Sequence, residues 1–317
     1  MPRETTVRRI PEYLGPDTEI RPEELDAYEA TGDWVMEPKV DGGFVAITMG
    51  DGGKIASLKS RDARTPEITG SNAGDLRDLS IPLKAGTILV GELEAFTQTA
   101  KRVSDAAGFR RVHLFDVLRS GDGSGEHDDL RHGSWVFRRA ILGNLWKHQI
   151  QPSPKLALRF PLVPYFVSAD PPAKKWRQMY EELVDGGFYE GVVLKLRAGT
   201  YQTHRSDGKT DSMVRCKKHV TGDFVYLGAA LTPGGKYSAP KETCRWGVYC
   251  DGIECGAKES HFKQTMLAPA PAAEKAFFVV NETVCEFMGW NRMDSGALRH
   301  AQFVRVRPDK SPEAANG

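Results

Sequence analysis

The stretch Glu37-Pro38-Lys39-Val40-Asp41-Gly42-Gly43 follows the apolar run Trp34-Val35-Met36, which has the composition of a buried strand. A lysine therefore stands where a strand ends, and the Asp-Gly that follows predicts a turn. An ordinary lysine has a pKa of about 10.4 and is a poor nucleophile at neutral pH, but cationic neighbours in a pocket can depress it so that the amine attacks phosphorus. Lys39 is thus a candidate reactive group, and an exposed turn lysine is the alternative.

Six further strings follow this K-x-D-G string in the chain. A K-x-D-G string alone arises by chance in roughly one chain in ten of this length and decides little. The strings that follow it in order are LKSRD (58–62), LVGELEAF (89–96), HLFDVL (113–118), EGVVLK (190–195), MVRCKK (213–218) and FVRVRPDK (303–310). Seven such strings in this order are not expected by chance. Together they resemble the covalent nucleotidyltransferases, and most closely the ATP-dependent DNA ligases, over nearly the whole chain.

The resemblance implies roles for the residues that match the motifs. The family's K-x-D-G lysine becomes adenylated, so Lys39 takes the role of the catalytic nucleophile. Glu37 falls where the family holds the adenine, and Phe115 matches the aromatic residue that stacks on the purine. Arg61 matches an arginine that contacts the nucleotide sugar or the reacting strand end, a role that suits a fixed fork of donors. By pattern alone Phe115 is typical of a core and Arg61 of a surface.

Two carboxylates match positions that the family uses near the ribose and a divalent metal ion, namely Glu92 in GELEAF and Glu190 in EGVVLK. Carboxylate oxygens suit Mg²⁺, for which Mn²⁺ is an expected substitute. Glu94 is an alternative to Glu92, because alternation on a strand places both on one face. The family also more often reads Asp-Gly-Glu where this chain has Val90-Gly91-Glu92.

Five cations complete the set that the resemblance assigns to the nucleotide: Lys195, Arg215, Lys217, Arg307 and Lys310. Arg215 and Lys217 are two residues apart, so on a strand they face the same way, toward the α-phosphate. Arg307 and Lys310, in FVRVRPDK, are expected to orient the leaving pyrophosphate.

The chain departs from the family pattern at further positions, among them Phe44, Thr210, Arg215 and Gln302, and an arginine is common in the family at positions 210 and 302. Many DNA ligases carry an arginine two residues after the K-x-D-G glycine, where this chain has Phe44, and this removes one side chain that contacts the strand phosphate. Arg215 replaces a commoner lysine, which preserves the charge but not the geometry.

Strand-like runs outnumber helical patterns and do not alternate with them, which predicts an α+β fold. Strands are expected at 34–36, 44–47, 88–90, 112–115 and 192–194, and helices at 136–149 and 176–184. After residue 222, short strand-like runs at 224–227, 246–249, 277–280 and 303–304 indicate a small barrel.

The resemblance adds domain identities to this pattern. It implies an ATP-grasp-like nucleotidyltransferase (adenylation) domain of antiparallel sheets with helices over residues 1–222. An OB-fold β-barrel over 223–310 follows. The sequence of residues 311–317 itself predicts a disordered tail. Because 38 residues precede Lys39, no separate N-terminal DNA-binding domain is expected, and the chain resembles a minimal two-domain ligase.

The composition is compatible with this interpretation. The 317 residues include 43 basic and 42 acidic side chains, but the net charge is −7 over residues 1–100, +5 over 101–199 and +3 over 200–317. The later two thirds can therefore present basic surface to phosphate. The apolar runs fall far short of the roughly 18 residues of a spanning helix, and the start lacks a secretory signal, so we expect a cytoplasmic protein without a membrane partner. Five cysteines, an odd number, fit reduced thiols without disulfides.

We therefore expect a monomeric ATP-dependent DNA ligase that uses ATP and Mg²⁺ to seal nicks in duplex DNA through a lysyl-AMP intermediate and a DNA-adenylate. An RNA ligase or an mRNA capping guanylyltransferase is an alternative, because both share K-x-D-G chemistry. A non-enzymatic nucleic-acid-binding protein, using aromatic and basic side chains of the barrel, is another. The loops at 119–134 and 231–245 are candidates for further contacts with DNA.

Overall fold

The computed structural model describes residues 13–61, 67–69, 73, 75–95, 110–121, 128–168, 174–186, 189–201, 209–232, 241–250, 262–289, 292–293, 295–298 and 301–315. Parts of the two expected loops, 122–127 and 233–240, lie outside these ranges, as do residues 1–12. Contacts divide the chain into two compact units, and the division falls between Lys217 and Lys218.

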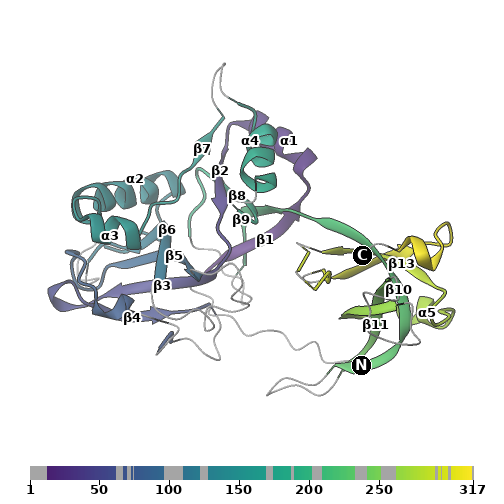
Figure 1. Ribbon diagram of the computed structural model, residues 1–317. Helices are drawn as coiled ribbons and strands as arrows, with labels where there is room; N and C mark the ends of the chain where they lie inside the picture. Colours follow the sequence, from purple (N-terminus) through teal and green to yellow (C-terminus); the bar gives the residue numbers. More distant parts are fainter. Residues whose placement is uncertain are drawn as a thin grey trace. The chain divides into compact units, whose positions relative to one another are not determined.

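The first sheet of the N-terminal unit has the strand order β1-β9-β8-β2-β7, and only the β1–β9 pair is parallel. Its strands are β1 (Gly15–Ile20), β2 (Trp34–Lys39), β7 (Phe166–Val167), β8 (Gly191–Leu196) and β9 (Lys209–Lys217). The helices α1 (Leu25–Thr31) and α4 (Trp176–Tyr180), the latter continued by the π-helical turn η7 (Glu181–Asp185), lie beside this sheet (Figure 1). Leu25 and Trp176 are buried there against Met36 and Val192.

The second sheet of this unit is fully antiparallel, with the order β4-β3-β5-β6. Its strands are β3 (Gly43–Met49), β4 (Ile55–Lys59), β5 (Ile88–Ala95) and β6 (Arg110–Arg119). The helix α2 (Trp135–Leu145), its π-helical end η6 (Trp146–Ile150) and α3 (Pro154–Arg159) lie together beside it (Figure 1). Leu142 and Phe160 join Val45 and Leu89 in its core.

The two sheets meet through a third apolar cluster, in which Ala46 of β3 and Val90 of β5 pack with Met213 of β9. Side chains alternate along a strand. The facing sides therefore carry the even-numbered residues of β3 and β5 and the odd-numbered residues of β2, β8 and β9.

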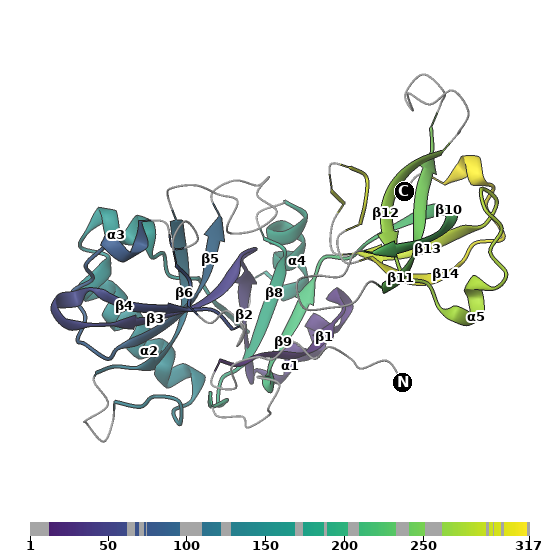
Figure 2. The same ribbon diagram turned by 90° about the horizontal axis from the view of Figure 1, so that it is seen from below.

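The C-terminal unit is one antiparallel sheet of the order β12-β11-β10-β13-β14. Its strands are β10 (Val220–Thr232), β11 (Lys241–Tyr249), β12 (Phe262–Ala268), β13 (Val284–Gly289) and β14 (Gln302–Val306), with the short helix α5 (Ala272–Lys275) (Figure 2). Phe224, Trp246 and Phe287 form its core. Within the described residues no ladder joins β12 to β14, so the closed OB-fold barrel stays a prediction, whereas the α+β class of antiparallel sheets with few helices is confirmed.

The predicted strand at Phe277–Val280 is wrong. These residues form the turn that follows α5, and Phe277 is 82% exposed. Phe278 alone turns inward, with its ring centroid 5.8 Å from that of Trp246. An apolar run forms a strand only if its side chains pack against a buried surface. Here Phe277, Val279 and Val280 remain exposed.

Residues 311–317, the expected tail, contain the 3-10 helix η8 (Pro312–Ala314) and Ala315, which is buried beside Val225 and Val284. The last two residues lie outside the described ranges.

Cysteine usage differs from the expectation at one position. Cys216, Cys244 and Cys285 are free and buried, but Cys250 is disulfide-bonded. An odd count excludes only complete pairing, and the expectation that the chain forms no disulfide is wrong.

No helix within the ranges that the structure describes is long and apolar enough to cross a membrane.

Candidate active site

Two lysines flank a glycine across three neighbouring strands. Lys39, the last residue of β2, lies opposite Gly191 of β8, and Gly191 lies opposite Lys217 of β9. A Cβ on Gly191 would lie 2.2 Å from the carbonyl oxygen of Cys216, so only glycine permits this approach of β8 to β9. The row therefore places both lysine side chains on the face that meets the second sheet, with no side chain between them.

The carboxylate of Glu190 pairs with both of these lysines. One of its oxygens, Oε1, forms an ion pair with Nζ of Lys39 and lies 3.2 Å from Nζ of Lys217. Burial opposes ionisation of Glu190, but the charges of Lys39 and Lys217 outweigh it and lower the pKa of its carboxyl to about 2. Burial also lowers the pKa of Lys217, although Glu190 acts against this shift. Glu190 is therefore ionised at neutral pH and holds two cations at the end of β2.

The second sheet contributes a carboxylate to the same region through β5. Glu92 lies opposite Phe44 of β3. Burial raises the pKa of Glu92, the charge of Lys39 opposes this rise, and the charge of Glu190 adds to it. Such mutual effects require proximity, so Glu92 and Glu190 approach the same lysine from different sheets.

The second residue of the Asp-Gly pair makes this approach possible. A Cβ on Gly42 would lie 2.4 Å from the carbonyl oxygen of Leu93 and 3.1 Å from Cγ of Glu92. The chain can therefore enter β3 against β5 only with glycine at this position.

Glu94 belongs to a different group of side chains. Its Oε2 lies 2.6 Å from Nε2 of His113 and 3.9 Å from Nη1 of Arg111. The hydrogen bond with His113 lowers the pKa of Glu94 against the effect of burial. Glu92, rather than Glu94, is therefore the carboxylate coupled to Lys39.

Glu37 and Lys195 form a buried ion pair on the same face of the first sheet. Oε2 of Glu37 lies 2.6 Å from Nζ of Lys195, and the two side chains are 3% and 5% exposed. The same Nζ lies 4.4 Å from the ring centroid of Phe115. The other oxygen of Glu37, Oε1, is buried and accepts no hydrogen bond from the residues that the structure describes. A buried acceptor without a donor is costly, so this oxygen fits an N–H group of a ligand.

Two arginines border this cluster. Arg215 shares the face of Lys217, and its Nε donates to Oε2 of Glu19 on β1 at 2.6 Å. Arg61, just after β4, has its guanidinium carbon 4.3 Å over the ring of Phe44.

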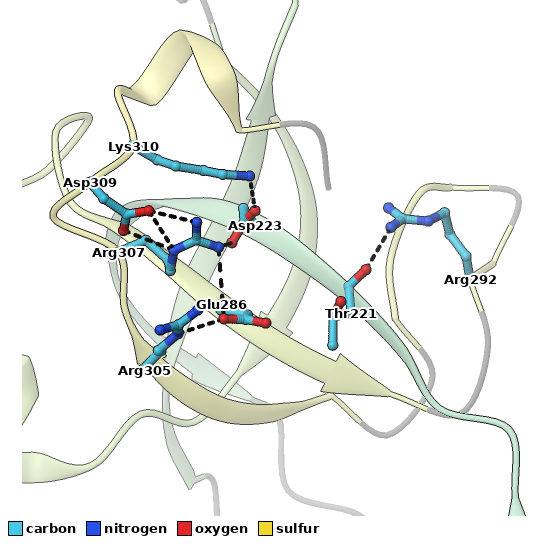
Figure 3. Close-up of polar contacts among 8 residues, drawn as sticks. All are labelled: Thr221, Asp223, Glu286, Arg292, Arg305, Arg307, Asp309 and Lys310. Carbon is cyan, nitrogen blue, oxygen red and sulfur yellow. Dashed lines mark hydrogen bonds and ion pairs between the residues drawn. The ribbon is translucent and has the colours of Figure 1, made fainter. Parts of the chain in front are cut away.

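Arg307 and Lys310 lie in the C-terminal unit and form a separate cluster (Figure 3). Arg307 donates from Nε and Nη2 to Asp309 at 2.9 and 2.7 Å, and from Nη1 to Asp223 at 3.1 Å. Lys310 donates to the other oxygen of Asp223. The hydrogen bonds to Asp309 raise the pKa of Arg307, so it remains a cation.

The motifs did not reveal three of these partners, namely Asp41, Glu19 and Asp223. Asp41 forms a hydrogen bond with Glu190, and its place in K-x-D-G was the available signal. No spacing links Glu19 to Arg215 or Asp223 to Lys310, because these pairs depend on strand neighbours distant in sequence. Within the described part of the chain, no group of three or more His, Cys, Asp or Glu side chains is arranged to hold a metal ion.

Solved structures of DNA ligases share this fold. A structure from a structure–function analysis of Lig E DNA ligases, which bind DNA with a minimal scaffold, matches with a TM-score of 0.55 and 17% identity over 93% of this chain and 99% of that one. Two structures called Pmar-Lig_Pre and Pmar-Lig_PreS3 match with TM-scores of 0.59 and 0.58, at 14% and 13% identity, over 93% of this chain and 68% of each of theirs. No protein-family model and no curated protein sequence matches the chain.

The chain therefore has the fold of the minimal DNA ligases, and the resemblance read from its motifs extends to the three-dimensional structure. At these identities the likeness concerns the fold.

Proposed function

We propose that this protein is an ATP-dependent DNA ligase that seals nicks in duplex DNA and acts as a monomer. The observation that carries the proposal is the cluster of Lys39, Lys217 and Glu190, which Glu92 approaches from the opposite sheet. This cluster offers a nucleophilic amine, a second cation for a phosphate and carboxylates for a divalent ion within one region. The fold shared with DNA ligases supports the class of enzyme.

The buried acceptor of Glu37 supports ATP as the nucleotide. The 6-amino group of adenine can donate to Oε1 of Glu37, which is buried without a donor among the described residues. Guanine carries a carbonyl oxygen at the same ring position and would place two acceptors in contact. Phe115 supplies an aromatic ring for the base, a contact worth about 1–3 kcal/mol. Lys195 orients Glu37 through their ion pair.

In the first step the ammonium of Lys39 gives a proton to solvent, and the resulting amine attacks the α-phosphorus of ATP. A second proton leaves the nitrogen for solvent as the new bond forms. A phosphorus–nitrogen bond forms, the bond to the bridging β-phosphate oxygen breaks, and pyrophosphate leaves with the electron pair. Lys217 and Arg215, on the same face as Lys39, offset the charge on the α-phosphate. Glu190 holds Lys217 in place, and Arg307 and Lys310 are assigned to the pyrophosphate.

Glu92 and Glu190 fit a divalent cation. Burial and then the charge of Glu190 raise the pKa of Glu92, and a cation between the two carboxylates would relieve this repulsion. One or two carboxylates together with phosphate oxygens are the ligands that Mg²⁺ takes, and Mn²⁺ would substitute. The ion would neutralise charge that develops on the phosphates.

Two further transfers complete the reaction. An oxygen of the 5′-phosphate of the nick attacks the adenylyl phosphorus, so that a phosphoanhydride bond forms, the phosphorus–nitrogen bond breaks and the nitrogen of Lys39 regains a proton from solvent. The 3′-hydroxyl then attacks the activated 5′-phosphorus and loses its proton to solvent, and AMP leaves with the electron pair of the anhydride bond as the phosphodiester forms. Binding of the duplex through phosphate contacts should weaken steeply with salt.

The proposal is tested by incubating the protein with α-³²P-labelled ATP or GTP and then with nicked duplexes of DNA, RNA or both. We expect a labelled protein adduct with ATP, transfer of the label to the nick and sealing of DNA. An adduct with GTP alone would indicate a capping enzyme, and sealing confined to RNA would indicate an RNA ligase. Salt-sensitive binding without any adduct would indicate a non-enzymatic nucleic-acid-binding protein.

A further inference from the structure

The guanidinium of Arg61 lies over the aromatic ring of Phe44. The guanidinium carbon of Arg61 lies 4.3 Å from the centroid of this ring. The ring is itself held in a row, with Tyr13 at 5.4 Å and Phe115 at 6.4 Å between centroids. Phe44 is thus an ordered platform.

Gly15 of β1 bounds the same guanidinium. A Cβ on Gly15 would lie 2.3 Å from Nη1 of Arg61, and the backbone of Gly15 is outside the left-handed region. The guanidinium therefore occupies the space that any larger residue at position 15 would need. An alanine here would displace Arg61 without straining the backbone.

The guanidinium lies within electrostatic range of the Lys39 cluster. Burial raises the pKa of Glu92, and the charge of Arg61, like that of Lys39, opposes this rise. Phe44, which the guanidinium overlies, is opposite Glu92 in the β3–β5 ladder, so Arg61 lies on the side of the second sheet that carries this carboxylate.

We propose that Phe44 and Gly15 are positioning residues that fix the guanidinium of Arg61 beside the Lys39 cluster, so that it binds a phosphate group of the reacting nucleotide or of the strand end. The inference rests on the proposed function. Contact with the ring uses a face of the guanidinium, whereas its N–H donors lie in its plane and match the oxygens of a phosphate. Fixing a long side chain before the substrate arrives lowers the entropy lost on binding.

Two rates distinguish whether Arg61 binds a phosphate of the nucleotide or the phosphate of the strand end. One is the rate of adduct formation with ATP, and the other is the rate at which a nick that already carries its adenylate is sealed. Arg61→Met, which keeps the apolar stem, identifies the step that needs the guanidinium. We expect Phe44→Leu to slow that same step about tenfold and to leave the other within about twofold. Phe44→Tyr, which keeps a ring, should stay within about twofold of wild type, and Gly15→Ala should slow the same step as Phe44→Leu.

A double-mutant cycle distinguishes positioning from general packing. In the Arg61→Met background, Phe44→Leu should have no further effect on the affected step. The inference is overturned if Phe44→Leu slows the step equally in the wild-type and Arg61→Met backgrounds. It is also overturned if Arg61→Met slows neither step. Gly15→Ala and Phe44→Tyr keep the test decisive if Phe44→Leu unfolds, which thermal unfolding detects. If the wild-type protein forms no adduct and seals no nick, the proposed function fails, and this inference fails with it.

Discussion

Glu190 pairs with the ammonium groups of Lys39 and Lys217, and the loss of Lys217 should affect the proposed chemistry. Lys217 is 5% exposed, lies 3.2 Å from Glu190 and shares the face of Lys39. In the proposed function its charge offsets that of the α-phosphate. We expect Lys217→Met to slow adduct formation about a hundredfold, the usual cost of losing one such stabilising group.

Lys174 provides the matched control for Lys217. It also pairs with a glutamate, Glu182, but its side chain is 60% exposed. Lys174→Met should leave the rate of adduct formation unchanged. Equal rates in the two variants would show that Lys217 does not serve the phosphate.

The choice between Glu92 and Glu94 gives a second prediction at this scale. Burial raises the pKa of Glu92, so its ionised form costs folding free energy at neutral pH, whereas Glu94 gains a hydrogen bond from His113. We expect Glu92→Gln to slow sealing about a hundredfold without lowering the unfolding temperature. Glu94→Gln should slow sealing far less and should lower the unfolding temperature. The reverse pattern would exchange the roles of the two carboxylates.

At the scale of the elements, glycine decides how closely β8 and β9 approach. A Cβ on Gly191 would lie 2.2 Å from a backbone oxygen, which cannot move away as a flexible side chain can. Gly191→Ala should therefore lower the free energy of unfolding, measured in urea, and should reduce adduct formation, because Lys39 and Lys217 stand on either side. A backbone clash of this kind typically costs at least about 1–3 kcal/mol.

Gly143 is the control within the same unit. It lies inside α2, and a Cβ there would meet nothing within 4 Å. Gly143→Ala should raise the free energy of unfolding by about 0.5–1 kcal/mol, because alanine favours a helix over glycine. A loss of stability at Gly143 comparable to that at Gly191 would contradict the packing argument.

Some features of the strands can be predicted from the sequence, and others cannot. Alternation predicts that Arg215 and Lys217 share a face, and the strands bear this out. Alternation cannot predict which strands are neighbours, so the ion pair of Arg215 with Glu19 could not be found. The run Phe277–Val280 satisfies a local pattern, but only Phe278 of the run packs against the core. Local patterns thus predict elements and shared faces, whereas register and tertiary pairing require the structure.

At the scale of the whole molecule, each compact unit contains a buried thiol, Cys216 in β9 and Cys285 in β13. Burial raises the pKa of each thiol from 9.0 to about 12. The thiolate fraction at pH 8 is then about a thousandfold below that of an ordinary cysteine. We expect both to resist alkylation in the native protein and to react on unfolding, with labelled peptides identified by mass spectrometry.

The pH dependence of this labelling has a definite sign. A raised pKa means that the native thiolate fraction keeps increasing above about pH 10, where an ordinary thiol has nearly levelled off. Labelling of either thiol in the native protein at the rate of an exposed cysteine would show that its unit opens or packs differently.

The whole account depends on Lys39 as the residue that becomes adenylated. The nucleophile lies on one sheet and the coupled carboxylate Glu92 on the other, so the proposed chemistry uses both sheets of the N-terminal unit. The most direct measurement is the labelled adduct formed with α-³²P-labelled ATP by the wild-type protein and by Lys39→Ala, with Lys174→Ala as a folded control. We predict a strong adduct for the wild type and the control and none for Lys39→Ala. An adduct of normal yield in Lys39→Ala would contradict the account.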